Sequence, residues 1–292
     1  MVPRQPASYP TMDTEHLRAW VGRSEHRGDE ITAAPLAALS ATLDRDDPAP
    51  QPGSEVPPLW HWLFFLPMAR ASEIGPDGHP RRGGFLPPVE LPRRMWAGGR
   101  LSFHHALQVG DEVTRTSTIR SVEAKTGRSG TLVFVTARHE IANARGVAIS
   151  EEQDIVYRDA PMPGAPAPPP LAGPPDAAFS RTIVADEVLL FRYSALTFNG
   201  HRIHYDRKYV TEVEGYPGLI VHGPLIATLL LDLLRRQQPD AVVKSYSFKA
   251  LRPTFDLDPF SVCGRPDGPG RWTLWAHDHA GLLTMQANAE TT

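Results

Sequence analysis

The chain contains 292 residues, of which 41% are hydrophobic and 22% are charged, a size that favours two domains over one small core. Its formal net charge is -3, so the chain lacks the excess of basic residues that nucleic-acid-binding proteins have, and no nucleic-acid partner is expected. The single cysteine, Cys263, excludes an internal disulfide and a thiolate metal cluster. The N-terminus has no apolar run behind a basic start, and no window holds the roughly 18 apolar residues of a membrane span. We therefore expect a cytoplasmic protein without a membrane partner.

The first half of the chain predicts a meandering antiparallel sheet. An acidic, Pro-rich stretch over residues 44–58 is interpreted as a surface loop. Residues 58–70, PLWHWLFFLPMAR, are apolar on most sides and predict a buried helix, with a strand as the alternative. Runs rich in Val, Ile, Thr and Phe, separated by Gly-containing turns, then predict strands. These strands are expected over residues 100–113, 114–125, 131–143 and 147–158.

The densest proline run, over residues 160–175, divides the chain almost in the middle. Such a run cannot continue a helix or a central strand, and it is typical of a semi-rigid linker. We therefore predict an N-terminal domain over 1–159, a linker over 160–178 and a C-terminal domain over 179–292.

The second half repeats the same kinds of predicted element, an apolar helix and antiparallel strands, in a similar order. Residues 181–197 begin as a strand and continue as a helix, with Asp186 as the expected N-cap. A strongly apolar helix follows from about Pro224 to Arg236, and strands are expected over 242–255, 259–266, 271–279 and 282–290. The predicted class is α+β, in which a curved antiparallel sheet wraps around one central helix, twice over.

The loop before the central helix contains His201, His204 and His222 within 22 residues. Each could be a structural group, and His201 and His204 could bind a metal, although a third ligand beyond Asp206 is not evident. A third interpretation starts from the helix end at Gly223, where free backbone N–H groups and the helix dipole can bind a thioester oxygen and stabilise an enolate. A histidine would then carry the proton near neutral pH.

The same loop resembles the MaoC-like hydratase branch of the hotdog fold, in which a His-x-Asp motif precedes a helix that begins with His-Gly. The matching residues are Asn199, His204, Tyr205, Asp206, His222 and Gly223. FNGHRIHYD followed by GYPGLIVHGPL is similar to the subgroup of mesaconyl-CoA (3-methylfumaryl-CoA) hydratase, itaconyl-CoA hydratase and the mitochondrial hydroxyacyl-thioester dehydratases. The close resemblance covers about 30 residues, and elsewhere it is one of architecture.

The resemblance implies a double hotdog whose first half has lost catalysis and helps to form the pocket. It implies a hydro-lyase that hydrates an α,β-unsaturated acyl-CoA to the 3-hydroxyacyl-CoA, such as mesaconyl-CoA to citramalyl-CoA. No metal or cofactor is expected. The protein is expected to form a homodimer or a higher homo-oligomer.

One departure from the family is informative. Asn199 stands where many members have an aspartate, and an amide cannot titrate. We therefore expect Asn199 to orient water, His204 to carry the proton, and the N–H of Gly223 to bind the enolate oxygen. His201 replaces an asparagine of the family, a substitution shared with the dehydratase subgroup. His222 is expected to brace the turn into the helix and is also a candidate substrate contact.

A negatively charged acyl-CoA needs local cations, and a guanidinium suits a second carboxylate of the acyl group through bidentate bonding. The candidates by motif neighbourhood are Arg93, Arg94, Arg202 and Arg252. Three alternatives stay open: a dehydratase for straight-chain acyl groups, an acyl-CoA thioesterase, and a non-catalytic acyl-thioester binding protein.

Overall fold

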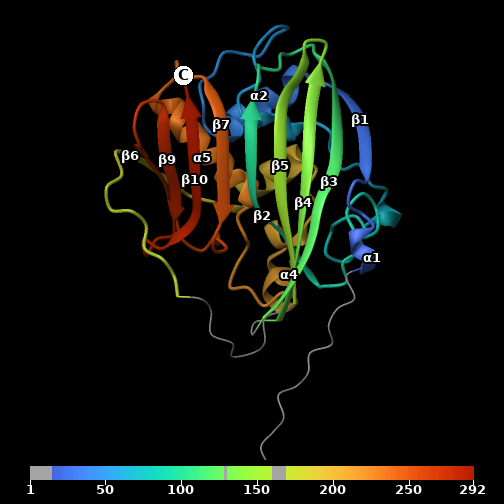
Figure 1. Ribbon diagram of the computed structural model, residues 1–292. Helices are drawn as coiled ribbons and strands as arrows, with labels where there is room; N and C mark the ends of the chain where they lie inside the picture. The colour runs from blue at the N-terminus through green and yellow to red at the C-terminus, as the bar shows by residue number, and fades with distance from the viewer. Residues whose placement is uncertain (1–14, 128–129, 160–168) are drawn as a thin grey trace, which may run out of the picture.

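The computed structural model describes residues 15–127, 130–159 and 169–292, and Figure 1 shows their arrangement. Within these ranges, ten strands form one antiparallel sheet in the order β1-β3-β4-β5-β2-β7-β10-β9-β8-β6. The strands before the linker are β1 (Ser24–Glu30), β2 (Arg93–Phe103), β3 (Glu112–Gly127), β4 (Gly130–Asn143) and β5 (Gly146–Arg158). The strands after it are β6 (Phe179–Ile183), β7 (Val243–Ala250), β8 (Phe260–Pro266), β9 (Arg271–His277) and β10 (Leu283–Thr291).

The two halves meet edge to edge where β2 pairs with β7, from Gly98↔Lys249 to Ser102↔Ser245. Only glycine fits at Gly98, because a Cβ there would lie 2.6 Å from the carbonyl oxygen of Phe248. Residues 93–97 of β2 stand outside this pairing with β7. The two predicted sheets are therefore one continuous sheet, in which the first part of β2 is free to border a cavity.

The predicted strands are confirmed in both halves, although β7 ends at Ala250, before the predicted bound at residue 255, and one further strand is shifted. Residues 100–113 do not form a single strand, because β2 already begins at Arg93 and ends at Phe103. The chain then turns through Gly110, whose φ of 96° lies in the left-handed region that glycine adopts readily. In β4 the residues alternate between buried and half-buried, which fits a sheet with one face on the core.

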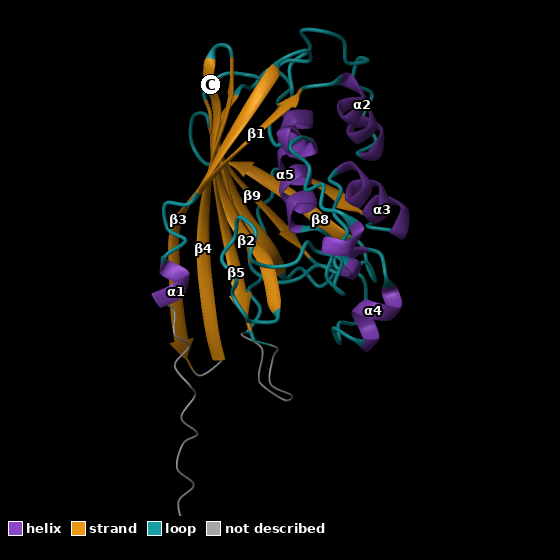
Figure 2. Ribbon diagram, turned by 90° about the vertical axis from the view of Figure 1, so that its right-hand side faces the viewer, coloured by secondary structure: helices purple, strands orange, loops and turns teal. Residues whose placement is uncertain are grey.

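The helices on the core side of the sheet are α2 (Ala33–Thr42), α3 (Glu187–Leu196), α4 (Arg207–Glu212) and α5 (Gly223–Gln237), whereas α1 (Glu15–Arg18) lies against β3. Figure 2 shows these four helices on one side of the sheet. The predicted N-cap of α3 is confirmed, since the Asp186 carboxylate accepts a hydrogen bond from Leu189 N at 2.8 Å. The predicted core helix is α5, and its residues from Leu225 to Leu234 are all buried. It packs chiefly on β8.

The helix predicted over residues 58–70 is wrong. Only a short 3-10 helix, η1 (Trp60–Leu63), forms there. Leu59 and Phe65 have φ of 71° and 56°, which a right-handed helix cannot include, and Pro67 lies two residues after Phe65. The first half therefore has no central helix comparable to α5 among its described residues. Its core face is covered instead by the side chains around η1, which are buried at Trp60, Leu63, Phe64 and Phe65.

The surface loop predicted over residues 44–58 is confirmed as a segment almost without regular structure. Residues 160–168 of the predicted linker lie outside the described residues, and the domain boundaries stay a prediction. Among the helices of the described ranges, none has the length and apolar character needed to cross a membrane.

The C-terminal end of α5 is anchored by a buried carboxylate. Asp232 accepts hydrogen bonds from Arg45 at 2.6 Å, Arg181 at 3.1 Å and Arg236 at 2.8 Å. Its side chain is only 1% exposed, so its charge depends on these three partners for stabilisation.

We expect Asp232→Ala to lower the free energy of unfolding by about 3 kcal/mol, because it leaves three guanidinium groups without their common partner. Denaturant titration followed by circular dichroism measures this change. Asp240→Ala, an exposed position just beyond α5, is the matched control and should stay within about 0.5 kcal/mol of the wild type. An unchanged denaturation midpoint for Asp232→Ala would contradict the anchoring role.

Candidate active site

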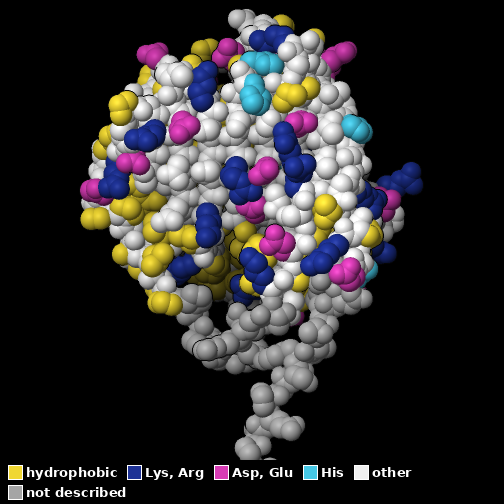
Figure 3. Space-filling model, viewed as in Figure 1, with side chains coloured by type: hydrophobic (Ala, Val, Ile, Leu, Met, Phe, Trp, Pro, Cys, Tyr) yellow, Lys and Arg dark blue, Asp and Glu magenta, His cyan; other side chains and the backbone are white. Residues whose placement is uncertain are grey.

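A large cavity of about 1610 Å³ lies between the two halves and is lined by residues from both. Its apolar wall includes Trp62 and Trp96, whose rings meet edge to face at a centroid distance of 4.9 Å. In Figure 3, apolar side chains line a hollow near the lower end of the sheet. The volume exceeds that of a typical pocket for one small molecule, so it has room for an acyl group and part of a long carrier arm.

The helix end expected at this site is present. The first intrahelical hydrogen bond of α5 runs from Ile226 N to His222 O at 3.1 Å. The N–H of Gly223 lies ahead of that bond and has no partner within the helix. Gly223 and Pro224 both line the cavity, so the positive end of the α5 dipole faces the space that a ligand would fill.

Alanine at position 223 should fold but bind the reacting thioester poorly. A Cβ built on Gly223 approaches no protein atom closer than 3.8 Å, from the carbonyl oxygen of Trp96. The protein itself therefore tolerates the methyl group, whereas a ligand oxygen that approaches the N–H would meet it. We expect Gly223→Ala to keep the wild-type melting temperature and to lose about 10- to 100-fold in kcat/KM, as measured by steady-state kinetics. Unchanged kinetics would remove Gly223 from the site.

His204 lies in η3 (Arg202–His204) and lines the cavity. Its Nδ1 is 2.7 Å from the carbonyl oxygen of Ile220, which can only accept, so Nδ1 carries the proton and Nε2 keeps a lone pair. Burial lowers the pKa of His204 to about 4, despite the opposing effect of this hydrogen bond. The imidazole is therefore neutral near pH 7 and can accept a proton.

His222 lies behind His204 and does not reach the cavity. The two rings stack at a centroid distance of 3.7 Å, and His222 Nε2 hydrogen-bonds to Ser194 Oγ at 2.8 Å. His222 is fully buried and is not among the cavity-lining residues. Because His204 stands between His222 and the ligand space, this position favours the expected bracing role over a substrate contact.

Asn199 and His201 both line the cavity. The Asn199 Oδ1 accepts a hydrogen bond from the backbone N of His201 at 3.0 Å, so its amide nitrogen is left to donate to a water or substrate oxygen. The His201 ring lies edge to face with His204 at 5.5 Å. Burial lowers the pKa of His201 to about 2, so this imidazole is also neutral.

The structure separates the four candidate arginines. Arg202 binds Asp206 at 2.7 Å and lies outside the cavity lining, so this geometry does not support its candidate role as a substrate ligand. Arg93 and Arg252 line the cavity and pair with acidic groups, Arg93 with Glu214 at 3.6 Å and Arg252 with Asp278 at 3.3 Å. Arg94 also lines the cavity, but it forms no ion pair with any residue in the described part of the chain.

Two further residues at the site come from the first half, Asp77 and His79. Asp77 Oδ2 is 3.0 Å from His79 Nδ1, and the His79 ring stacks on His201 at a centroid distance of 3.9 Å. The sequence contains a weak signal for these two residues, an Asp-x-His in a Gly-Pro-Asp-Gly turn. Because they lie more than 120 residues before His201, the sequence alone does not associate them with the site. For the alternative in which His201 and His204 bind a metal, only His204 Nε2 remains as a ligand atom on that residue, since His204 Nδ1 is held by a backbone carbonyl.

Asp77, His79 and His201 do bring their potential ligand atoms within 4.8 Å of one another. However, both carboxylate oxygens of Asp77 already accept hydrogen bonds from His79, one from its ring and one from its backbone N. The arrangement is therefore a hydrogen-bonded carboxylate–imidazole pair beside a second imidazole.

Comparisons with known proteins identify the family. Residues 59–256 match the family of hydroxyacyl-thioester dehydratase type 2. The chain belongs to this family. It is 49% identical to mesaconyl-C(4)-CoA hydratase of Chloroflexus aurantiacus, over 96% of this chain and 99% of that protein. It is 28% identical to the mitochondrial hydroxyacyl-thioester dehydratase type 2 of Schizosaccharomyces pombe, over 80% of this chain and 88% of that protein.

The fold agrees with this assignment. HtdX of Mycobacterium tuberculosis superposes with a TM-score of 0.65 at 18% identity, covering 92% of this chain and all of that one. A second M. tuberculosis protein, described as a double hotdog, superposes with a TM-score of 0.56 at 15% identity, covering 93% and 96% of the two chains. The chain is thus a hydro-lyase of the hydroxyacyl-thioester dehydratase type 2 family with the predicted double hotdog fold.

The first half of the chain supplies the part of the cavity wall that includes Glu151. Glu151 is 2% exposed and accepts hydrogen bonds from His61 Nε2 at 3.1 Å, Trp62 Nε1 at 3.0 Å and Gln153 Nε2 at 2.9 Å. Burial opposes ionisation of Glu151, but the hydrogen bonds outweigh it and lower its pKa to about 2. With its oxygens held in this way, Glu151 is a structural carboxylate and is poorly suited to activate water.

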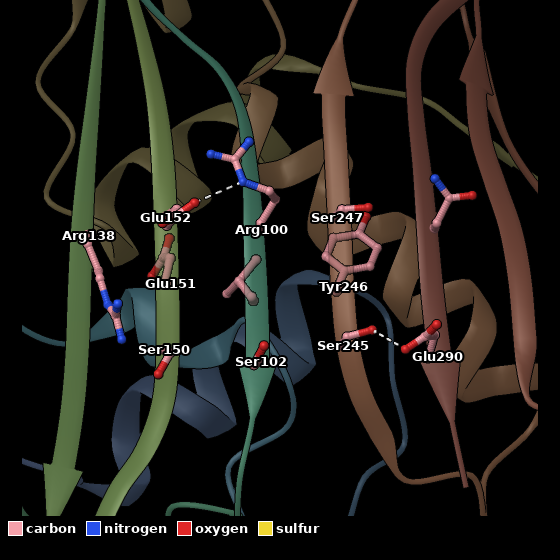
Figure 4. A pocket seen from close by; sticks show the side chains of 12 residues that line it. Arg100, Ser102, Arg138, Ser150, Glu151, Glu152, Ser245, Tyr246, Ser247 and Glu290 are labelled. Atoms are coloured by element: carbon pink, nitrogen blue, oxygen red, sulfur yellow. Dashed lines mark hydrogen bonds and ion pairs between the residues drawn. The ribbon is translucent and has the colours of Figure 1, made fainter. Parts of the chain in front are cut away.

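A smaller hollow of about 390 Å³ lies at the junction of the two halves, on the face of the sheet away from α5. Figure 4 shows that its polar side chains pair with one another, Arg100 with Glu152 and Ser245 with Glu290. The large cavity, where Arg94 and the histidines remain open to a ligand, is therefore the candidate active site.

Proposed function

We propose that the protein reversibly adds water to an α,β-unsaturated dicarboxylic acyl-CoA of the mesaconyl-C(4)-CoA type. The proposal rests chiefly on Arg94, which faces the histidine-lined cavity without an acidic partner among the described residues. A half-buried guanidinium without an acidic partner is suited to bind a ligand that supplies the opposite charge. The 49% identity with mesaconyl-C(4)-CoA hydratase supports the same substrate class.

In the hydration direction, a water molecule binds between the Asn199 amide and His204 Nε2. His204 removes a proton from the water as its oxygen forms a bond to the β-carbon. The electron pair of the double bond moves to the thioester, and the N–H of Gly223 binds the resulting enolate oxygen. Protonation of the α-carbon completes the reaction, and dehydration follows the reverse order.

The second carboxylate of the substrate is assigned to Arg94. In 3-methylfumaryl-CoA this carboxylate is attached to the β-carbon, so its ligand has to lie near the group that activates water. The positive charge of Arg94 is close enough to contribute to the lowered pKa of both His79 and His201, after the larger effect of burial. This proximity supports a role of Arg94 in orienting the β-carbon toward the histidines.

The family name favours one alternative substrate class, straight-chain hydroxyacyl thioesters. A panel of enoyl-CoA esters that includes mesaconyl-C(4)-CoA and crotonyl-CoA separates the two. Hydration removes the absorbance of the conjugated double bond without releasing thiol, hydrolysis releases thiol, and binding alone does neither. We expect hydration of mesaconyl-C(4)-CoA, and activity on crotonyl-CoA alone would contradict the dicarboxylate preference. The homo-oligomeric state stays a prediction that light scattering can test.

A further inference from the structure

The first half contributes a well-defined turn to the site, and this turn carries Asp77 and His79. This turn is closed by hydrogen bonds from Gly75 N to His79 O at 2.7 Å and from Gly78 N to Gly75 O at 3.0 Å. It fits against the catalytic loop of the second half, because a Cβ on Gly78 would lie 1.8 Å from the carbonyl oxygen of Gly200. The contact is fixed further by Arg202 N, which donates to Asp77 O at 2.9 Å.

Asp77 sets the tautomer of His79. Burial opposes ionisation of Asp77, but its two hydrogen bonds from His79 outweigh burial and hold its pKa well below the ordinary value. An ionised carboxylate only accepts, so His79 Nδ1 carries the proton and Nε2 keeps a lone pair. Burial lowers the pKa of His79, against the effect of Asp77. His79 is therefore a neutral base whose protonated form has a carboxylate to stabilise it.

The imidazoles form a row along the cavity. The His79 ring lies 3.9 Å from that of His201, which lies 5.5 Å from that of His204, and all three residues line the same cavity. Hydration needs two proton transfers at different atoms, from the water oxygen and to the α-carbon. The amide of Asn199 can perform neither, whereas a second titratable group beside His204 would allow the two transfers to use different groups.

We propose that His79, held by Asp77, is the group that delivers the proton to the α-carbon, and that it receives this proton from His204 across His201. This inference rests on the proposed hydration and names its second proton carrier. His204 takes the proton from water while the new C–O bond forms and the enolate appears. The proton passes to His79 and then to the α-carbon, which consumes the enolate. All three imidazoles start and end neutral, and no proton is gained or lost from the enzyme.

The test separates the two proton transfers. A saturated dicarboxylic acyl-CoA, methylsuccinyl-CoA, has α-hydrogens but no hydroxyl group to lose. In D₂O, the wild-type enzyme should exchange its α-hydrogens, as measured by mass spectrometry at early times. His79→Gln should lose this exchange, whereas His204→Gln should retain most of it. Asp77→Asn should slow it by roughly tenfold or more, because the carboxylate no longer stabilises protonated His79.

In turnover with the enoyl-CoA substrate, His79→Gln should lose about 10²- to 10³-fold in kcat with a smaller change in KM. His104→Gln is the matched control, since His104 is exposed and its ring hydrogen-bonds only to Ser150 among the described residues. Wild-type exchange and turnover in His79→Gln would overturn the relay. So would activity that depends on a bound divalent metal and is lost on chelation. If the wild-type enzyme hydrates no enoyl-CoA, it is the proposed function that fails.

Discussion

Replacing His204 with alanine should lower kcat by about two to four powers of ten, the range expected when a general base is removed. His204 is the cavity-lining histidine whose Nδ1 is fixed on a backbone carbonyl, which leaves Nε2 to accept the proton of water. Because water activation fails before the C–O bond forms, KM should change much less than kcat.

The assay follows loss of the conjugated double bond at saturating enoyl-CoA. A thermal melt should accompany this assay to check that the variant is folded, because His204 also stacks on His222 and its loss leaves a small cavity. His204→Gln keeps most of the volume and should be equally slow. Near-normal turnover in a folded His204 variant would remove this residue from the proton transfer.

The same geometry predicts the acid limb of the pH profile. Burial lowers the pKa of His204 to about 4, so this base stays neutral well below the 6.5 of an ordinary histidine, and burial also lowers the pKa of His79. The kcat/KM should therefore remain level as the pH falls through 6.5 and should decrease only at lower pH. A decrease in kcat/KM that already begins at pH 6.5 or above as the pH falls would contradict the neutral state of these histidines.

Replacing Arg94 with methionine should change which substrate the enzyme prefers. We expect kcat/KM for mesaconyl-C(4)-CoA to fall by about 10²- to 10³-fold, since the substrate carboxylate would be buried without its charged partner. For crotonyl-CoA, which lacks the carboxylate, the change should be less than about threefold. The ratio of the two kcat/KM values is the measurement.

Arg93→Met is the matched control for this ratio. Arg93 is the neighbouring residue on β2, but its guanidinium is held by Glu214 and by Tyr216 Oη at 3.1 Å. Its loss should affect both substrates alike. An Arg94→Met enzyme with an unchanged ratio would assign the carboxylate to another group.

The sequence predicted those features that depend on local pattern. Alternating apolar residues gave the strands, and the apolar circumference with a Gly-Pro start gave α5. The helix over residues 58–70 was wrong because its apolar residues reflected burial, whereas the backbone at Leu59 and Phe65 is left-handed. Hydrophobicity alone does not distinguish a buried helix from a buried irregular segment.

The site was predictable only where its residues are close in sequence. Asn199, His201, His204 and Gly223 lie on one continuous stretch, and each lines the cavity. His79 approaches His201 only because two halves fold against each other, which no local pattern encodes. Similarly, the difference between Arg93 and Arg94 depends on whether an acidic group from a distant segment is within reach.

The edge-to-edge join of β2 and β7 bears on aggregation. Each of these strands would be an exposed edge if its half stood alone, and a bare edge can pair with strands of other molecules. Joined, they leave β1 and β6 as the outer strands of the described sheet. β1 is almost fully exposed and largely charged, and β6 is only five residues long. The protein can thus enclose a wide apolar cavity while its remaining edges discourage strand addition.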